Sequence, residues 1–160
     1  KVSDLIGYQS DVTQCPPGLD FGCAGNTSRA LLQGITMMGQ QRLGKFELTL
    51  TLDWLNAKDR NTDQTLPRRA SNQQTFAVDW NDGPWQLGGT LLNVGSRPDG
   101  GVLLPAYQLV DLNARWRFER VWQLEARLQN ALDKDYEPTR DYQSVGRQFW
   151  IGLRYEGRGL

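Results

Sequence analysis

Hydrophobic and polar residues alternate along most of this chain. Between Phe46 and Trp54, Phe, Leu and Trp occupy every second position and Glu, Thr and Asp occupy the positions between them. Successive side chains of a β-strand point to opposite faces, so a period of two predicts strands rather than helices. The predicted antiparallel strands lie near residues 2–8, 28–41, 45–57, 69–81, 85–96, 107–118, 122–132 and 147–156.

The segments between these strands are alternately short and long. Tight turns are predicted at 41–44, 81–84 and 119–121, and long loops rich in Gly, Pro, Asp and Asn at 8–27, 58–67, 96–106 and 133–146. Because consecutive strands are antiparallel, the short turns share one rim of the sheet and the long loops share the other. This layout is typical of outer-membrane β-barrels.

Aromatic residues flank the predicted short turns, namely Phe46, Trp80, Trp85, Phe118 and Trp122. A membrane barrel carries such a belt where lipid meets water. The core of a soluble β-sandwich also holds aromatic residues, so the belt alone leaves both alternatives open.

The polar side of the predicted strands favours the membrane barrel. A tight turn at 119–121 sets Arg115 opposite Glu125 and Asn113 opposite Arg127, all on one face. An unpaired charge in a dry core costs several kcal/mol, whereas a wet lumen accepts such a face. We therefore expect the apolar side of each strand to face lipid and the polar side to face the interior of a barrel.

Composition narrows the function classes. The chain has 160 residues, of which 39% are hydrophobic, and a mean hydropathy of −0.57. It contains no apolar run of about 18 residues, but a membrane-spanning β-strand needs only about 9–11. The 18 basic and 18 acidic residues cancel, which gives no electrostatic reason to expect nucleic acid as a partner. The absence of His excludes a histidine metal site and a Ser-His-Asp triad.

Two motifs resemble the closing strands of TonB-dependent outer-membrane receptors. Residues 130–136, "NALDKDY", resemble the Asn-Leu-x-Asp-x-x-Tyr pattern that ends the penultimate strand, and Gly146-Arg147 resembles the start of the last strand. Residues 55–70 and 79–97 resemble the members of this family that take up vitamin B12 (cobalamin). The likeness covers nearly the whole chain and is weakest at 9–27.

The resemblance implies that residues 1–160 are the C-terminal third of a barrel of about 22 strands whose lumen holds a plug. It implies a location in the Gram-negative outer membrane, in contact with lipid, and uptake of cobalamin or a related corrinoid without a bound cofactor. TonB would act through an N-terminal region. That region, the plug and a signal peptide are not expected within this sequence.

Two features depart from the family pattern. The family usually finishes on an aromatic residue, but Tyr155 is followed by "EGRGL". The pair of cysteines in the first long loop is not a family hallmark.

Two alternatives remain at this point. A ferric-siderophore receptor would share the same barrel, since much of the substrate contact would lie in strands and a plug outside this sequence. An autonomous small barrel of about eight strands could act as a binding protein or a lipid-modifying enzyme. No nucleophile with a plausible base is present, so no catalytic residue is predicted.

The resemblance marks Arg68 and Tyr142 as positions from which the barrel reaches its ligand. A guanidinium donates several hydrogen bonds to the amide carbonyls and phosphate of a corrinoid, and a tyrosine offers a flat face with a hydroxyl. The structural alternatives are that Arg68 pairs with a loop carboxylate and that Tyr142 caps the rim of the barrel.

Cys15 and Cys23 are predicted to form a disulfide, because seven residues with two Pro and two Gly separate them in a loop exposed to an oxidising compartment. Two free thiols are the alternative. No metal site is predicted. Four loop aspartates have no EF-hand spacing and are interpreted as solvated carboxylates: Asp59, Asp63, Asp133 and Asp135.

Overall fold

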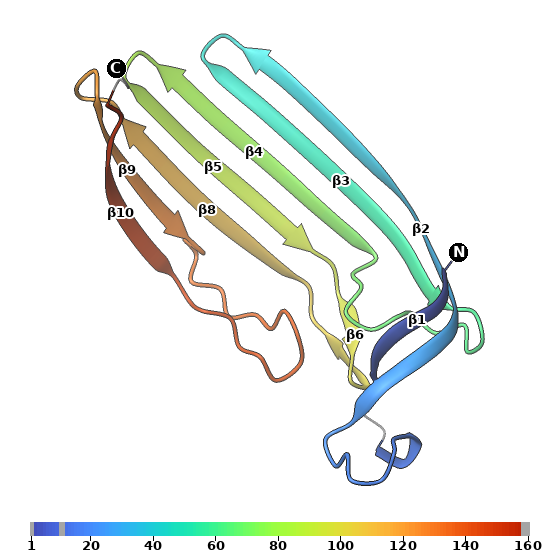
Figure 1. Ribbon diagram of the computed structural model, residues 1–160. Coiled ribbons are helices and arrows are strands. Elements are labelled where there is room, and N and C mark those ends of the chain that lie inside the picture. Colours follow the sequence, from blue (N-terminus) through green and yellow to red (C-terminus); the bar gives the residue numbers. More distant parts are fainter. Residues whose placement is uncertain (1, 10–11, 158–160) are drawn as a thin grey trace.

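The computed structural model describes residues 2–9 and 12–157 and consists almost entirely of strands. Its elements are β1 (Val2–Gln9), η1 (Val12–Gln14), β2 (Cys23–Leu43), β3 (Phe46–Asp59), β4 (Asn72–Asp82), β5 (Trp85–Val94), β6 (Arg97–Asp99), β7 (Val102–Leu104), β8 (Tyr107–Trp116), β9 (Trp122–Gln129) and β10 (Gln148–Tyr155). Eight strands pair antiparallel in the order β1-β2-β3-β4-β5-β8-β9-β10, and β6 and β7 form a separate hairpin (Figure 1). No described helix is long and apolar enough to span a membrane.

The predicted all-β antiparallel fold is confirmed, and each predicted strand corresponds to one strand of the large sheet. The start of the second strand is a correction, since β2 begins at Cys23 instead of 28. The reason is that β1 and β2 remain paired from Val2 and Ala30 as far as Gln9 and Cys23. The predicted tail beyond Tyr155 is described only to residue 157, and its last three residues lie outside the described part.

A second correction concerns the predicted loop at 96–106, which contains the β6–β7 hairpin. Arg97 pairs with Leu104 and Asp99 with Val102 around a two-residue turn. That turn is Gly100-Gly101, and both residues have positive φ, 54° and 82°. Glycine adopts this left-handed conformation without steric cost, so the Gly-Gly pair permits a tight hairpin turn.

The two faces of the large sheet differ in chemistry. The strand registers align the apolar side of β3 with the apolar side of β4, β5, β8, β9 and β10. We call this common side of the sheet the outer face. The outer face includes Phe46, Leu48, Leu50, Val78, Trp80, Leu87, Leu91, Leu112, Trp116, Leu124, Leu128, Phe149, Ile151 and Leu153. The opposite side, the inner face, includes Glu47, Thr49, Asp53, Asp79, Asn113, Arg115, Glu125, Arg127 and Arg154. The predicted orientation of β3 and the predicted Arg115–Glu125 register are therefore confirmed.

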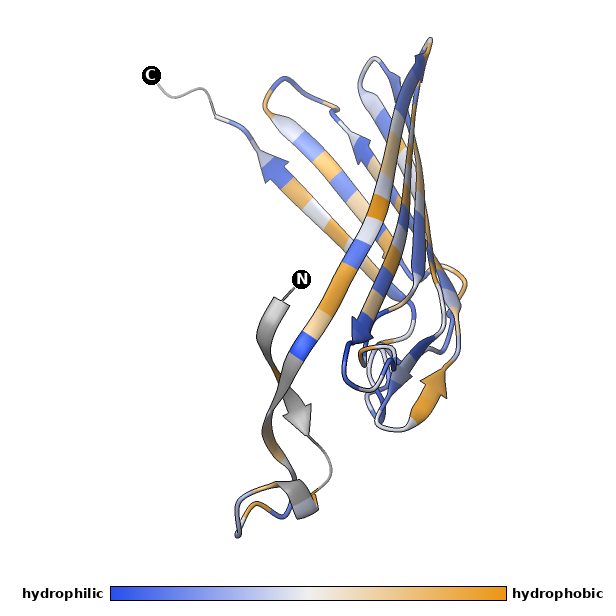
Figure 2. Cartoon of the chain, turned by 90° about the vertical axis from the view of Figure 1, so that its right-hand side faces the viewer, coloured by the Kyte–Doolittle hydropathy of each residue, from blue (hydrophilic) through white to orange (hydrophobic). Residues whose placement is uncertain are grey.

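The sheet is curved, and hydrophilic and hydrophobic residues alternate along its strands (Figure 2). The exposure of the side chains indicates that the polar inner face is the concave one. Side chains converge on a concave face and spread apart on a convex one. In agreement, Gln123 and Glu125 on the inner face of β9 are 4% and 5% exposed, whereas Trp122 on the outer face of the same strand is 36% exposed. The structure is thus a segment of a barrel wall with a polar lining and an apolar exterior, as a lipid-embedded barrel requires.

Aromatic rings form one border of the apolar outer face, and side-chain amides form the other. Near the short turns, Trp85 stacks on Trp116 at 5.0 Å between ring centroids, and Trp122 contacts Tyr155 at 4.9 Å. Toward the long loops the outer face becomes polar at the row of paired residues Gln74, Asn93 and Gln108. The apolar band between these limits is the part of the wall suited to hydrocarbon.

A small apolar cluster lies at the long-loop end of β2 and β3. Ala30, Ala57 and Leu66 are buried together, and Leu32 and Leu55 pack against them. The N–H of Leu66 donates to the carbonyl of Ala57 at 2.9 Å, which holds the loop between β3 and β4 over the sheet. The cluster fixes the path of the loop that carries Arg68.

The pairing of β2 with β3 makes a specific demand at Gly34. A methyl group at this position would overlap the carbonyl oxygen of Trp54, whereas one at Gly39 on the same strand would meet no atom within 4 Å. We expect Gly34→Ala to lower the free energy of unfolding by about 1–3 kcal/mol, because the strands must separate locally. Gly39→Ala, the matched control, should change it by less than about 0.5 kcal/mol. Urea unfolding of the full-length protein in lipid vesicles measures both, and equal stabilities would contradict this account.

Candidate functional site

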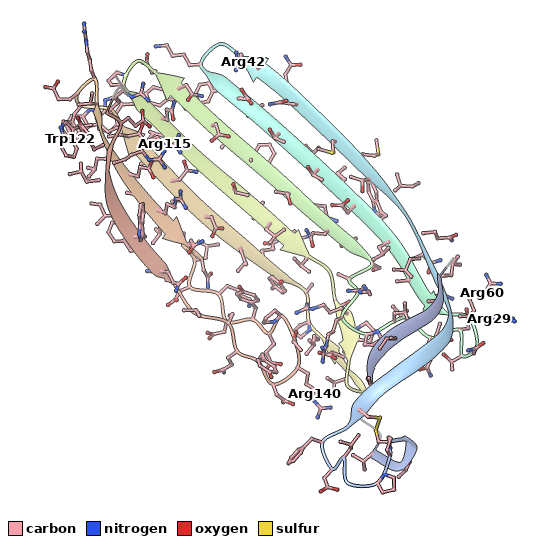
Figure 3. The ribbon with its side chains drawn as sticks, in the orientation of Figure 1. Arg29, Arg42, Arg60, Arg115, Trp122 and Arg140 are labelled. Atoms are coloured by element: carbon pink, nitrogen blue, oxygen red, sulfur yellow. A yellow bond between two sulfur atoms is a disulfide. The ribbon has the colours of Figure 1, made fainter. Side chains whose placement is uncertain are left out.

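The long loops gather at one end of the sheet, opposite the turns at 44–45, 83–84 and 117–121 (Figure 1). Arg29, Arg60 and Arg140 lie at this end, while Arg42, Arg115 and Trp122 lie toward the short turns (Figure 3). The predicted arrangement of turns and loops is therefore confirmed. We call the segments 12–22, 60–71, 95–106 and 130–147 the long-loop rim.

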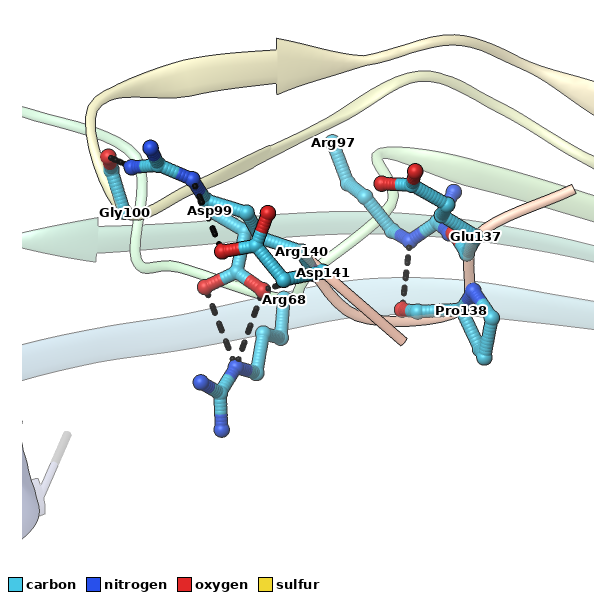
Figure 4. Close-up of polar contacts among 8 residues, drawn as sticks. All are labelled: Arg68, Arg97, Asp99, Gly100, Glu137, Pro138, Arg140 and Asp141. Atoms are coloured by element: carbon cyan, nitrogen blue, oxygen red, sulfur yellow. Dashed lines mark hydrogen bonds and ion pairs between the residues drawn. The ribbon is translucent and has the colours of Figure 1, made fainter. Parts of the chain in front are cut away.

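Two buried charged side chains of the rim come from the β6–β7 hairpin. Arg97 and Asp99 are 4% and 3% exposed and lie two positions apart on β6, so both point to the same face. The carboxylate of Asp99 accepts two hydrogen bonds from Nε of Arg68, at 3.0 and 3.1 Å, and one from the backbone N–H of Arg140, at 2.9 Å (Figure 4). Asp99 thus connects two loops that are distant in sequence.

Arg97 contacts the last loop in a different way. Its Nε donates to the carbonyl of Pro138 at 3.2 Å, and its Nη2 donates to the carbonyl of Glu137 (Figure 4). Its guanidinium lies 5.1 Å from the ring centroid of Tyr107, and Tyr107 in turn stacks on Tyr136 at 4.4 Å. The last loop is therefore held against the hairpin by backbone carbonyls and by a stack of rings. The remaining nitrogen, Nη1, is buried without a hydrogen-bond partner.

Tyr107 begins β8 on the loop side of the polar row that ends the apolar band, so it lies outside the membrane-spanning part. Burial raises the pKa of its phenol, with a smaller opposing effect from the charge of Arg97. A phenol with a raised pKa stays neutral near pH 7, so it offers Arg97 an uncharged aromatic face.

Arg68 occupies a special backbone position in the loop between β3 and β4. Its φ is 61°, and its N–H donates to the carbonyl of Pro98 at 2.7 Å. The side chain is half-exposed, and the two terminal nitrogens point away from Asp99 (Figure 4). The pairing with a loop carboxylate that the sequence left as an alternative is present, and it uses only Nε.

Tyr142 lies in the last loop, two residues after Arg140, and is 70% exposed. Its N–H donates to the carbonyl of Thr139 at 3.1 Å, which closes a tight turn. Next to it in sequence, Gln143 and Ser144 line a cavity of about 310 Å³ together with Pro105, Asp135, Tyr136 and Glu137. The structure places both Tyr142 and Arg68 on the long-loop rim, and no described hydrogen bond or ion pair joins them.

The first long loop is closed covalently. The sulfur atoms of Cys15 and Cys23 are bonded at 2.14 Å, with Cα atoms 5.7 Å apart, which is the pairing that the sequence predicts. Phe21, inside this ring, is almost fully exposed. The bridge holds a protruding tip of the rim.

The inner face carries a second group of buried charge, below the rim. The carboxylate of Glu125 lies 3.2 Å from Nε of Arg154, 3.6 Å from Nε of Arg115 and 4.0 Å from Nη2 of Arg127. Gln123 donates to the same carboxylate at 2.7 Å. Three guanidinium groups around one carboxylate compensate its burial and give this part of the wall a net positive charge.

The loop aspartates that the sequence raised as a possible cation site make local contacts. Asp63 pairs with Lys58 at 3.0 Å, Asp59 accepts the N–H of Asn61, and Asp133 accepts the N–H of Arg147. Over residues 2–9 and 12–157, no group of three or more His, Cys, Asp or Glu side chains is placed to hold a metal ion.

The sequence missed the role of Arg97 and Asp99 because both fall in a segment interpreted as a loop. One signal was available, since Gly100-Gly101 between short extended stretches is typical of a hairpin. Arg154 was missed for another reason. Its contact with Glu125 depends on the register between β9 and β10, which are separated by the longest loop of the C-terminal half.

Residues 1–131 match the family described as "TonB dependent receptor-like, beta-barrel". The chain belongs to this family. Its members are receptors and transporters of the Gram-negative outer membrane and not enzymes, so the predicted location is confirmed.

Solved structures of TonB-dependent receptors share the fold. The chain is similar to the copper transporter OprC (TM-score 0.75, 18% identity, 96% of this chain and 27% of that chain). It is also similar to the ferric enterobactin receptor PfeA of Pseudomonas aeruginosa (0.73, 16%, 96% and 27%) and to P. aeruginosa FpvA bound to pyoverdine (0.71, 12%, 95% and 23%). This chain therefore spans about a quarter of the length of these structures.

We expect the disulfide to be present in the TonB-dependent receptor as it is made in the cell. Thiol titration of the unreduced, denatured full-length receptor should detect no thiols from Cys15 and Cys23, with the Cys15→Ser/Cys23→Ser double variant as the reference. Reduction should lower the free energy of unfolding by about 2–3 kcal/mol, the entropy of closing so short a ring. Two reactive thiols above the reference would refute the bridge.

The buried charge on the inner face predicts a large effect of neutralising Glu125. In the full-length receptor, Glu125→Gln should lower the free energy of unfolding in urea by about 1–3 kcal/mol, because three arginines lose the carboxylate they share. Glu156 also pairs with Arg154, at 3.7 Å, but is half-exposed. Glu156→Gln, the matched control, should have an effect below about 0.5 kcal/mol. Equal effects of the two substitutions would show that the burial of Glu125 does not contribute to the free energy of unfolding.

Proposed function

We propose that the chain is part of an outer-membrane receptor for TonB-dependent uptake of cobalamin or a related corrinoid. The observation that carries this proposal is the orientation of the Arg68 side chain. Asp99 holds its Nε, while its terminal nitrogens point away from Asp99 and the side chain is half-exposed on the long-loop rim (Figure 4). A guanidinium held in this way presents donors in a fixed direction to a ligand that arrives from outside the cell.

The chemistry of a corrinoid suits the rim. Its edge carries amide carbonyls and a phosphate, which accept hydrogen bonds from an arginine. Tyr142 is 70% exposed, and the next two residues of the same loop, Gln143 and Ser144, line the cavity of about 310 Å³. The resemblance of residues 55–70 and 79–97 to the cobalamin-uptake members of the family adds sequence support.

The proposal includes the rest of the receptor. In the described sheet, β1 and β10 each have one neighbouring strand, so both edges are free to pair with further strands. Together with the coverage of about a quarter of its structural neighbours, this supports residues 1–160 as the C-terminal third of a barrel of about 22 strands around a plug. TonB would act through the N-terminal region. A reading frame that does not extend several hundred residues upstream would overturn this part.

A ferric-siderophore receptor is the second candidate. Its support is the fold shared with the ferric enterobactin receptor and with FpvA bound to pyoverdine, although identities of 16% and 12% show the fold alone. Anionic iron complexes would also attract the arginines of the rim.

Removal of either proposed contact should weaken ligand binding. Arg68→Ala or Tyr142→Ala in the full-length receptor should raise the Kd for cobalamin roughly thirtyfold, the size of effect seen at binding hot spots. Arg60→Ala, an exposed rim arginine on the same loop, is the control and should leave the Kd unchanged. Equilibrium binding to outer membranes that contain equal amounts of each variant measures the effect.

Two outcomes separate the candidates. If Arg68→Ala and Tyr142→Ala insert normally and bind cobalamin with unchanged affinity, the assignment of the two residues is wrong. If the unmodified receptor ignores cobalamin and takes up a ferric siderophore, the substrate is wrong and the second candidate replaces it.

A further inference from the structure

The β6–β7 hairpin contacts both loops that carry the proposed ligand-binding residues. We propose that Arg97 and Asp99, which we call the rim clamp, hold these loops in one arrangement before a ligand binds. In this proposal Asp99 is a positioning residue that acts through Arg68 and, more weakly, through the loop of Tyr142. The effect on cobalamin binding rests on the proposed function, whereas the holding of the loops does not.

The hairpin is a suitable anchor because it is short and tightly turned. Its turn consists of two glycines, and the alternation of β6 sends Arg97 and Asp99 to one side. The carbonyl of the intervening Pro98 accepts the N–H of Arg68 at 2.7 Å. All three residues of β6 therefore bind a loop of the rim.

Burial makes the contacts of Asp99 obligatory. A carboxylate that is 3% exposed needs compensating hydrogen bonds or a counter-charge. Asp99 obtains three hydrogen bonds from two segments, one 31 residues and the other 41 residues away in sequence. Because a charge-assisted hydrogen bond is directional and strong, the positions of Arg68 and Arg140 are coupled through this carboxylate.

Arg97 supplies the second half of the clamp, and it acts on the last loop alone. Its two donors reach the adjacent carbonyls of Glu137 and Pro138, and Tyr107 covers the face of the guanidinium. Arg140 closes the contact from the other side, since its Nη1 donates to the carbonyl of Gly100. The segment 137–142, which contains Tyr142, is thus held by Arg97 at one end of β6 and by Asp99 and Gly100 at the other.

Pre-organisation gives the clamp its effect on binding. A ligand that meets loops already in place does not have to order them, and that saving appears as affinity. Arg68 needs this support in particular, because its φ of 61° lies in a region that non-glycine residues seldom occupy. Without Asp99, its guanidinium would sample directions that do not reach the ligand.

Amide hydrogen exchange of the ligand-free, full-length receptor in vesicles tests the clamp directly. Asp99→Asn should raise exchange about tenfold in segments 66–70 and 137–142 together. Asp141→Asn is the matched control, because this exposed carboxylate pairs with Arg140 at 3.4 Å in the same loop, and it should change neither segment. Unchanged exchange in Asp99→Asn would overturn the clamp.

Arg97→Lys provides a second test that is independent of Asp99. Lysine keeps the charge but cannot reach both carbonyls as the guanidinium fork does. Exchange should rise in 137–142 and stay at the unmodified level in 66–70, since no described hydrogen bond or ion pair joins Arg97 to Arg68. An equal rise in both segments would indicate general loosening of the hairpin and would contradict the clamp as described.

A double-variant cycle with cobalamin tests whether Asp99 acts through Arg68. Asp99→Asn should raise the Kd about tenfold in the unmodified receptor and by clearly less than tenfold in the Arg68→Ala background, where only its hold on the loop of Tyr142 remains. Additive losses would show that Asp99 acts independently and would overturn its positioning role. If exchange responds as expected but no variant changes cobalamin binding, the proposed function fails and the clamp stands. If Arg68→Ala weakens binding but exchange does not respond, the clamp fails and the proposed function stands.

Discussion

Hydrogen bonding of the backbone is the constraint on which the whole structure depends. Hydrocarbon offers no partner to an N–H or C=O group, so a wall in lipid must pair every such group strand to strand. The long antiparallel ladder from β1 to β10 satisfies this demand across the sheet. The distribution of side chains is the reverse of that in a soluble protein. The apolar side chains point outward, and the polar ones line a concave surface.

In this inverted arrangement, charged side chains are among the most deeply buried ones. Few hydrophobic side chains are buried in the described residues, whereas Glu125 and Asp99 are almost fully covered. Each solves the cost of burial by collecting partners. Glu125 gathers arginines from neighbouring strands of the wall, and Asp99 gathers donors from separate loops of the rim. In this protein, buried carboxylates therefore help to fix the relative positions of strands and loops, as a hydrophobic core does in a soluble protein.

The rim shows how a rigid wall supports a binding surface made of loops. Strand ends fix where each loop begins and ends, but the strands do not determine how the loops meet. The β6–β7 hairpin supplies that information, since its three residues bind the β3–β4 loop and the last loop. A family that varies its loops can in this way keep one barrel and change the ligand.

The sequence by itself determined the strands, their two faces, the alternation of turns and loops, and the Arg115–Glu125 register. These features are local, because a period of two and a tight turn relate residues that are neighbours along the chain. Only the tertiary structure decided that Arg154 joins Glu125 and that Asp99 joins Arg68 to Arg140. Those contacts span long loops whose paths follow from turn geometry and from the need to satisfy buried charge, and no periodicity in the sequence records them.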